Sequence, residues 1–472
     1  MKKNNQAMLR KLPAVDTILQ DPDLQAHVSR FPRKIVINSI QQAIQQARNH
    51  IVAPNTDEMT EDEISSSIKA KVKQTIETTM ARHYKRVINA AGIILHTGLG
   101  RAVLAKDALD QIQDELKSYS LLQIDPETSK RTKRDGRIEW LLQQLTGAQA
   151  ATVVNNNAAA TAIVLNTFAK GREVIVSRGQ LVEIGGSFRL PDVMAFSGAK
   201  LVEVGTTNKT HARDYENAIT ENTAAILRVH PSNYKIQGFS SEVPLEEMAE
   251  IAHRNNLVMI DDVGAGVLMD FSPFGFEHEL TLAESVDKGA DVITASADKL
   301  IGAAQGGIIL GKSDMIKAIR KNQFARILRV GKLTLTVLEA TLKLFLDESV
   351  AIREIPTLQM LTRSGDDIAK QAKRIASKLQ QTDQKASVVT IDGFSQVGSG
   401  SLPAQNLATT LVKISPRQST AESLAKQLRR YATPIFARIQ KEHVLIDPRT
   451  LRDGDEKILI TALLEIMDKK TE

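Results

Sequence analysis

Short apolar segments alternate with helical patterns along the central part of the chain. Seven segments rich in Val, Ile, Leu and Ala predict β-strands, and the stretches between them repeat apolar positions at intervals typical of helices. Such alternation predicts an α/β fold with a mostly parallel sheet wrapped by helices. The predicted strands are residues 151–154, 173–177, 201–204, 224–229, 257–261, 291–294 and 307–310.

The two flanking parts have different patterns. Residues 33–51 and 61–82 show helical periodicity around a breaker-rich link at 53–56, and residues 329–346 predict a long amphipathic helix. We expect a helical N-terminal domain (1–85), an α/β core domain (86–330), and a linker helix with a small α+β C-terminal domain (331–472). In the last domain, predicted strands cover 387–391, 408–414, 434–439 and 443–447, and predicted helices cover 420–431 and 455–468.

Composition narrows the classes of function. The chain has 472 residues and no cysteine, which excludes disulfides, thiolate zinc sites and a cysteine nucleophile. Its nine histidines show no metal-ligand cluster, so we expect no metal. No apolar run is long enough to span a bilayer and no signal-type region follows the N-terminus, so we expect a cytoplasmic protein that does not bind membranes.

The net charge of +6 mildly favours a polyanionic partner. Residues 1–85 hold 13 basic and 9 acidic residues, so most of the excess lies in the N-terminal region. A solvated charged surface explains the same composition.

Lys299 is the candidate nucleophile. The predicted strand at 291–294 runs into Ser296-Ala297-Asp298-Lys299 and then into a glycine-rich stretch. A lysine held at a strand end, partly desolvated and beside a phosphate-binding hydroxyl such as Ser296, can form a Schiff base with pyridoxal phosphate. A solvated loop lysine is the alternative for this motif taken alone.

Two further strand ends carry polar residues that suit the same cofactor. Asp262 ends an apolar run, where a carboxylate can keep the pyridine nitrogen protonated; Asp261 is the second choice, and a capping aspartate is the alternative. Asn156 and Asn157 follow the strand at 151–154 and precede an alanine-rich helix, whose first amides suit a phosphate.

A third strand end adds His230, which lies in the polar segment 228–234 at the same predicted sheet edge. In a parallel α/β sheet, ligands bind at the carboxyl ends of the strands. We therefore expect these side chains to share one site.

These segments resemble bacterial selenocysteine synthase, the L-seryl-tRNA(Sec) selenium transferase family of fold type I pyridoxal phosphate enzymes. The resemblance covers nearly the whole chain, with departures beside the lysine at Ala297 and at Ala303-Ala304. The matching segments are residues 11–16, 87–101, 153–160, 177–189, 205–208, 230–234, 298–300, 324–330, 398–403 and 437–439.

The resemblance implies a reaction. L-seryl-tRNA(Sec) would lose its β-hydroxyl through a cofactor-bound dehydroalanyl intermediate, and selenophosphate would then supply selenium to give L-selenocysteinyl-tRNA(Sec). Lys299 would bind the cofactor and remove the α-proton, and Asp262 would hold the ring nitrogen. Arg101, Arg326 and Arg329 are the residues that the resemblance points to for selenophosphate, because planar guanidinium groups bind phosphate oxygens in pairs.

The resemblance also implies a ring-shaped homo-oligomer, with ten subunits as the expected number, and an N-terminal domain that binds the tRNA. Two other functions stay open at this point. One is a pyridoxal phosphate lyase acting on a small amino acid or amino sugar acid, although relatives of that kind tend to lack the helical N-terminal domain. The other is a non-catalytic tRNA-binding protein on the same scaffold, which the presence of Lys299 and Asp262 disfavours.

Overall fold

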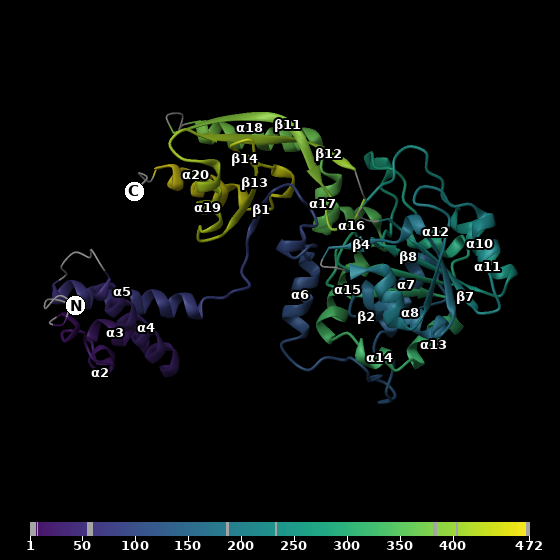
Figure 1. The fold of residues 1–472 in the computed structure, drawn as a ribbon, viewed down its shortest axis with the longest axis horizontal. Helices are drawn as coiled ribbons and strands as arrows, with labels where there is room; N and C mark the ends of the chain where they lie inside the picture. Colours follow the sequence, from purple (N-terminus) through teal and green to yellow (C-terminus); the bar gives the residue numbers. More distant parts are fainter. Residues whose placement is uncertain are drawn as a thin grey trace. The chain divides into compact units, whose positions relative to one another are not determined.

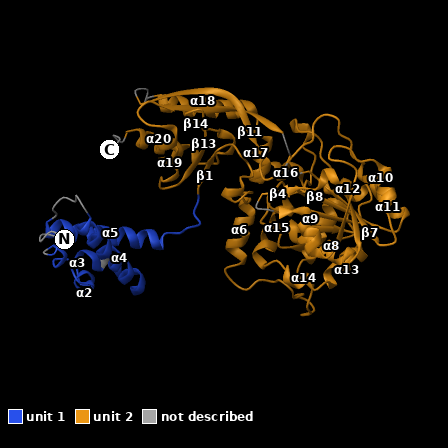
Figure 2. Ribbon diagram, in the orientation of Figure 1, with its two compact units in different colours: residues 1–86 blue, residues 87–472 orange. Residues whose placement is uncertain are grey.

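The chain forms two compact units, residues 1–86 and residues 87–472 (Figure 2). The computed structural model describes residues 6, 8–53, 60–185, 188–231, 234–380, 385–402 and 405–468. Among these residues, no helix is both long enough and apolar enough to cross a membrane.

The first unit is helical. Its two longest helices begin and end within two residues of the predicted bounds, which confirms those predictions. Along α5, Ile64, Ile68, Val72 and Ile76 are buried at every fourth position, so one face of the helix packs against the rest of the unit. The helices are α2 (Val15–Leu19), α3 (Pro22–Val28), α4 (Arg33–Val52) and α5 (Glu61–Met80).

The second unit contains a seven-stranded sheet, whose strands β2, β7 and β8 are labelled in Figure 1. The strand order is β2-β10-β9-β8-β7-β3-β6. Strands β9, β8, β7, β3 and β6 run parallel, and β10 is antiparallel to both of its neighbours. All seven predicted strands are confirmed, and so is the α/β class. The strands are β2 (Ala150–Val154), β3 (Glu173–Ser177), β6 (Lys200–Val204), β7 (Thr223–Val229), β8 (Val258–Gly264), β9 (Val292–Ser296) and β10 (Gly307–Gly311).

Helices cover both faces of this sheet, and each face has its own apolar core. One core takes side chains from α6, α7, α10, α11, α12 and α15, and the other takes them from α8, α9 and α13. The bounds are α6 (Lys106–Glu115), α7 (Gly136–Thr146), α8 (Asn157–Ala169), α9 (Leu190–Ser197), α10 (Ala212–Ala218), α11 (Leu245–Arg254), α12 (Leu282–Asp287), α13 (Ser313–Lys321), α14 (Phe324–Ile327) and α15 (Lys332–Leu344), with a hairpin of β4 (Glu183–Ile184) and β5 (Phe188–Arg189).

The long helix predicted over 329–346 is shorter in the structure. Helix α15 begins at Lys332, with Gly331 in an extended conformation as its N-cap. Arg329 forms a β-bridge with Val154, so the chain is still extended where the apolar periodicity begins. The prediction was wrong at this end because backbone pairing with β2 outcompetes helix formation.

A smaller five-stranded sheet has the order β1-β13-β14-β12-β11. Side chains from α18, α19 and α20 form its core. The four predicted strands and two predicted helices of this region are confirmed. The bounds are β1 (Ile88–Ala90), α16 (Glu348–Glu354), α17 (Pro356–Thr362), α18 (Gly365–Leu379), β11 (Ala386–Gln396), β12 (Asn406–Pro416), α19 (Ala421–Arg429), β13 (Ile435–Gln440), β14 (His443–Ile446) and α20 (Asp455–Asp468).

Strand β1 ties the start of this unit to the small sheet. It pairs in parallel with β13, and the chain then turns at Gly92, whose φ is +69°. A Cβ at Gly92 would lie 1.9 Å from Oδ2 of the buried Asp447, so this position requires glycine on two counts. The turn directs residues 93–101 toward the carboxyl edge of the large sheet.

Candidate active site

A cavity of about 250 Å³ lies at the carboxyl edge of the large sheet. Seven of the nine predicted site residues line it, and they come from the ends of β2, β7, β8 and β9 and from the segment after β1. Parallel strands bring their carboxyl ends to one edge, which explains how residues far apart in sequence meet. The seven are Arg101, Asn156, Asn157, His230, Asp262, Ser296 and Lys299.

Lys299 follows β9 and is buried, with 6% of its surface exposed. Its Nζ donates a hydrogen bond of 3.4 Å to the carbonyl of Gly400. Burial lowers the pKa of Lys299, and the nearby charge of Arg101 lowers it further, against the opposing effect of Asp262 and Asp298. A larger fraction of the amine is therefore neutral and able to act as a nucleophile.

Asp262 lies within β8 and is held by hydrogen bonds from two other elements. Asn157 Nδ2 donates to its Oδ1 at 2.7 Å, Thr294 Oγ1 donates to Oδ1 at 3.0 Å, and Thr161 Oγ1 donates to Oδ2 at 3.1 Å. Burial raises the pKa of Asp262, and the three donors oppose that shift. A protonated ring nitrogen beside this carboxylate would lower its pKa, because an opposite charge favours the ionised form.

Asp261, the second choice for this role, points elsewhere. Its carboxylate forms an ion pair with Arg228 at 2.8 Å, and its side chain is completely buried. Neighbouring residues of a strand face opposite sides of the sheet, so only one of the two can face the cavity. The cavity is lined by Asp262 and not by Asp261.

The start of α8 forms a cradle for an anion. Asn156 is the N-cap, and its side chain accepts a hydrogen bond from the amide of Ala159 at 2.9 Å. The helix begins at the cavity wall, so its first amides and its dipole favour negative charge there. Gly307 of β10 packs against this turn, where a Cβ would lie 2.1 Å from the carbonyl oxygen of Asn156.

Two more predicted residues complete this wall. Ser296 ends β9 with 7% of its surface exposed, which leaves its hydroxyl at the cavity. His230 follows β7, and its amide donates to the carbonyl of Asp262 at 2.9 Å. Burial lowers the pKa of His230 to about 4, so its imidazole is neutral at pH 7. Ser232 and Asn233 of the same segment lie outside the described residues.

The buried polar atoms of the cavity fit a polar cofactor. Within the described part of the chain, Nδ1 of His230 and Oδ1 of Asn157 are buried without a hydrogen-bond partner. Buried polar atoms are normally paired, so such orphans in a cavity indicate a missing polar ligand. The anion cradle, the buried amine and the buried carboxylate are the three features that pyridoxal phosphate requires. No group of three or more His, Asp or Glu side chains among the described residues could hold a metal ion.

The three predicted arginines are in different places. Arg101 has a φ of +62° and its Nη1 donates to Oδ2 of Asp298 at 2.7 Å inside the cavity. Arg326 and Arg329 are exposed and do not line it. However, the carbonyl of Leu328 accepts from the amide of Asn155 at 3.1 Å, so this arginine segment lies beside the start of the anion cradle.

Arg326 and Arg329 belong to a cluster of positive charge. The pKa of Arg329 is lowered by partial desolvation and by the neighbouring charges of Arg134, Arg326 and Arg131. Like charges gathered in this way bind an anion more strongly than one arginine does.

Sequence reasoning missed two participants. Asp298 lines the cavity and pairs with Arg101, and its position directly before Lys299 was a usable signal. Gly400, whose carbonyl accepts from Lys299, is 101 residues away, and no local pattern connects the two.

The neighbouring aspartates allow a matched test. Asp261→Asn leaves Arg228 buried without its counter-charge, so it should lower the free energy of unfolding by about 3 kcal/mol or more. Asp262→Asn removes a buried charge and keeps one acceptor oxygen, so it should lower the free energy of unfolding by less than about 1 kcal/mol. Urea denaturation of the two variants measures the difference, and equal losses would contradict the assigned orientations.

Comparisons with known proteins show which family the chain belongs to. Residues 87–452 match the L-seryl-tRNA selenium transferase family, and residues 9–48 match the family described as selenocysteine synthase N terminal. The chain is 43% identical over 460 residues to the L-seryl-tRNA(Sec) selenium transferase of Clostridium botulinum (strain Okra / Type B1), which covers 98% of this chain and 99% of that one. It is 45% identical over 461 residues to the enzyme of the same name from Alkaliphilus metalliredigens (strain QYMF), with the same coverage.

Among solved structures, D-glucosaminate-6-phosphate ammonia-lyase is similar, with a TM-score of 0.57 and 21% identity over 83% of this chain and 98% of that chain. At that identity the likeness shows the fold alone, which is that of the fold type I pyridoxal phosphate enzymes. The family matches and the two relatives cover nearly the whole sequence. The chain therefore belongs to the L-seryl-tRNA selenium transferase family.

Proposed function

We propose that the cavity around Lys299 is where this protein converts L-seryl-tRNA(Sec) to L-selenocysteinyl-tRNA(Sec), with pyridoxal phosphate as cofactor and selenophosphate as selenium donor. The observation that carries the proposal is the grouping of a buried lysine, a buried carboxylate and a helix N-terminus around one cavity. The reaction replaces the β-hydroxyl of the seryl group by selenium. Because its substrate is an aminoacyl-tRNA, we place it in the cytoplasm.

The position of each cavity residue indicates its role. The first amides of α8, with Asn156, Asn157 and Ser296, would hold the cofactor phosphate, and Asp262 would keep the ring nitrogen protonated. When bound, pyridoxal phosphate supplies an electron-withdrawing ring that stabilises negative charge at the α-carbon of the seryl group. Lys299 Nζ holds the cofactor and then accepts the α-proton, which its lowered pKa permits.

His230 serves this site as a neutral hydrogen-bonding group. Burial keeps its imidazole uncharged, and its Nδ1 is available for a polar group in the cavity. A neutral imidazole adds no positive charge beside Lys299, which keeps the amine pKa from falling further.

The N-terminal unit favours the tRNA enzyme over an amino sugar acid lyase. Residues 9–48 match a family described as selenocysteine synthase N terminal, and the unit carries an excess of basic residues. We assign tRNA binding to this N-terminal unit. A non-catalytic scaffold has no use for an amine of lowered pKa beside a buried carboxylate, so the cavity argues against that alternative.

The direct test is a conversion assay. The protein is incubated with pyridoxal phosphate, seryl-tRNA(Sec) and selenophosphate, and the amino acid released from the tRNA is identified by mass. We expect selenocysteine from the wild type and from the surface control Lys288→Ala, and only serine from Lys299→Ala. Unchanged serine from a wild type that keeps its cofactor absorbance would refute the transferase and favour the lyase.

Selenophosphate binding is assigned to Arg101, Arg326 and Arg329. We expect Arg326→Ala and Arg329→Ala each to raise the KM for selenophosphate by about tenfold, since each removes a charge-assisted hydrogen bond worth about 1.5–3 kcal/mol. The KM for seryl-tRNA(Sec) should stay within about twofold, and the exposed Arg213→Ala should change neither constant. A rise confined to the tRNA KM would show that these arginines contact the nucleic acid instead.

We also propose a homo-oligomeric ring, with ten subunits as the expected number. Ala158 and Phe188 line the cofactor cavity and also an apolar groove with the exposed Phe196 and Ile327. An exposed apolar patch of this kind commonly marks a protein interface, so a neighbouring subunit would complete the site. Light scattering should give a mass several times that of the chain, and a monomer or a simple dimer would contradict the ring.

A further inference from the structure

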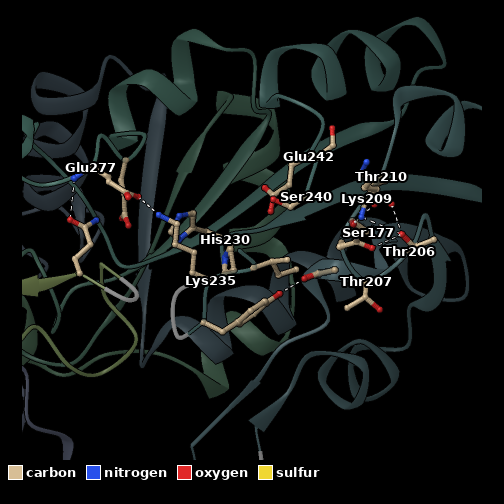
Figure 3. Close-up of a pocket in the computed structure, with 18 of the residues that line it drawn as sticks. Ser177, Thr206, Thr207, Lys209, Thr210, His230, Lys235, Ser240, Glu242 and Glu277 are labelled. Atoms are coloured by element: carbon tan, nitrogen blue, oxygen red, sulfur yellow. Dashed lines mark hydrogen bonds and ion pairs between the residues drawn. The ribbon is translucent and has the colours of Figure 1, made fainter. Parts of the chain in front are cut away.

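A second cavity, of about 240 Å³, lies beside the cofactor cavity. Ser177 ends β3, residues 206–210 follow β6, and His230 follows β7, so this cavity occupies the same carboxyl edge of the sheet (Figure 3). His230 belongs to the walls of both cavities. The volume of the second cavity lies just below the lower limit of about 300 Å³ for small-molecule sites, so it suits one compact ligand.

The lining of the second cavity suits a ligand rich in hydroxyl and amino groups. Figure 3 shows Ser177, Thr206 and Thr210 gathered at one end and Glu277 at the other, with His230 and Lys235 between them. Three carboxylates, those of Glu242, Glu277 and Glu279, line the cavity, and Lys235 is paired with Glu277. Carboxylates repel phosphate groups and accept hydrogen bonds from sugar hydroxyls, so a neutral sugar fits and a run of phosphates does not.

Glu279 is the carboxylate best placed to receive a new donor. Burial, together with the neighbouring charge of Glu277, raises the pKa of Glu279 to about 7. Within the described residues, its side chain has no hydrogen bond or ion pair. A half-buried acceptor without a partner gains more from a ligand hydroxyl than an exposed one does.

An aromatic side chain stands close to this cavity. Phe239 is 87% exposed, and Nζ of the cavity residue Lys209 lies 5.4 Å from its ring centroid. The side chain of Asn208, another cavity residue, donates to the carbonyl of Phe239 and fixes that backbone. An exposed aromatic ring beside a sugar-binding cavity offers a surface on which a base can stack.

We propose that the second cavity binds the terminal nucleoside of the aminoacyl-tRNA, with Glu279 accepting a hydrogen bond from the free ribose hydroxyl and Phe239 stacking on the base. The inference rests on the proposed function. Serine is esterified to the terminal ribose, so a seryl group at Lys299 brings that ribose to the immediate neighbourhood of the cofactor cavity. The cavity that shares His230 with it is the adjoining polar space at the carboxyl edge.

The stacking contact is tested by steady-state kinetics with seryl-tRNA(Sec). Phe239→Ala should raise the KM for the tRNA by about tenfold, as expected for loss of one stacked base. Its kcat and its cofactor absorbance should match the wild type. The matched control is Phe394→Ala, which removes another exposed ring, on β11, and should leave the tRNA KM unchanged. Equal KM values for the two variants would overturn the stacking assignment.

The ribose contact is tested by changing both partners. The substrate change is a seryl-tRNA(Sec) whose terminal adenosine lacks the 2′-hydroxyl, and it should raise the wild-type KM by about fivefold or more. In Glu279→Ala the same substrate change should have no further effect, whereas the exposed Glu250→Ala should respond as the wild type does. Additive effects in Glu279→Ala, or no response of the wild type, would overturn the ribose assignment.

These outcomes distinguish a failure of the proposed function from a failure of the nucleoside site. A wild type that makes no selenocysteine refutes the proposed function. A wild type that makes it, while Phe239→Ala and Glu279→Ala behave as their controls, refutes only the nucleoside site. The 2′-deoxy substrate is tested on unmodified protein, so the ribose assignment can be refuted even where a variant folds poorly.

Discussion

The buried carboxylate of Asp262 is the constraint on which the site depends. An ionised carboxyl group costs several kcal/mol to bury unless donors surround it. Here the donors come from Asn157 and Thr161 of α8 and from Thr294 of β9, while Asp262 itself lies in β8. Satisfying this one group therefore fixes the helix that cradles the anion and the strand that leads to Lys299. Any displacement of α8 or β9 would leave the carboxylate underpaired in an apolar interior.

A second constraint brings the C-terminal part of the chain to Lys299. The amides of Ile94 and Leu95 bond to the carbonyls of Gln396 and Val397, and this pairing places Arg101 and Gly400 at the cavity. Residues 398–400 all have positive φ, and the hydroxyl of Ser399 bonds to the carbonyl of Leu95. Such a backbone is strained for a non-glycine residue and persists only where surrounding contacts hold it.

The local sequence pattern was sufficient to predict the helices and strands of this fold. It was not sufficient to predict the long-range contacts between them. Apolar runs located every strand of the large sheet because the strands are short and all but the edge strand β6 are buried along most of their length. The chemistry of strand ends likewise led to Lys299, Asp262 and Asn156. The choice between Asp261 and Asp262 needed the structure, since adjacent residues differ only in the face they occupy. Contacts such as that between Arg101 and Asp298 join residues 197 positions apart, and no periodicity reports them.

The proposed function requires the cofactor to be bonded to one particular amine, Nζ of Lys299. Borohydride reduction of the cofactor-loaded protein makes that linkage permanent, and peptide mapping by mass spectrometry then locates the pyridoxyl group. We expect the group on the peptide that contains Lys299 and at no other lysine. A pyridoxyl group on another lysine, with Lys299 unmodified, would contradict the assignment of this cavity as the active site.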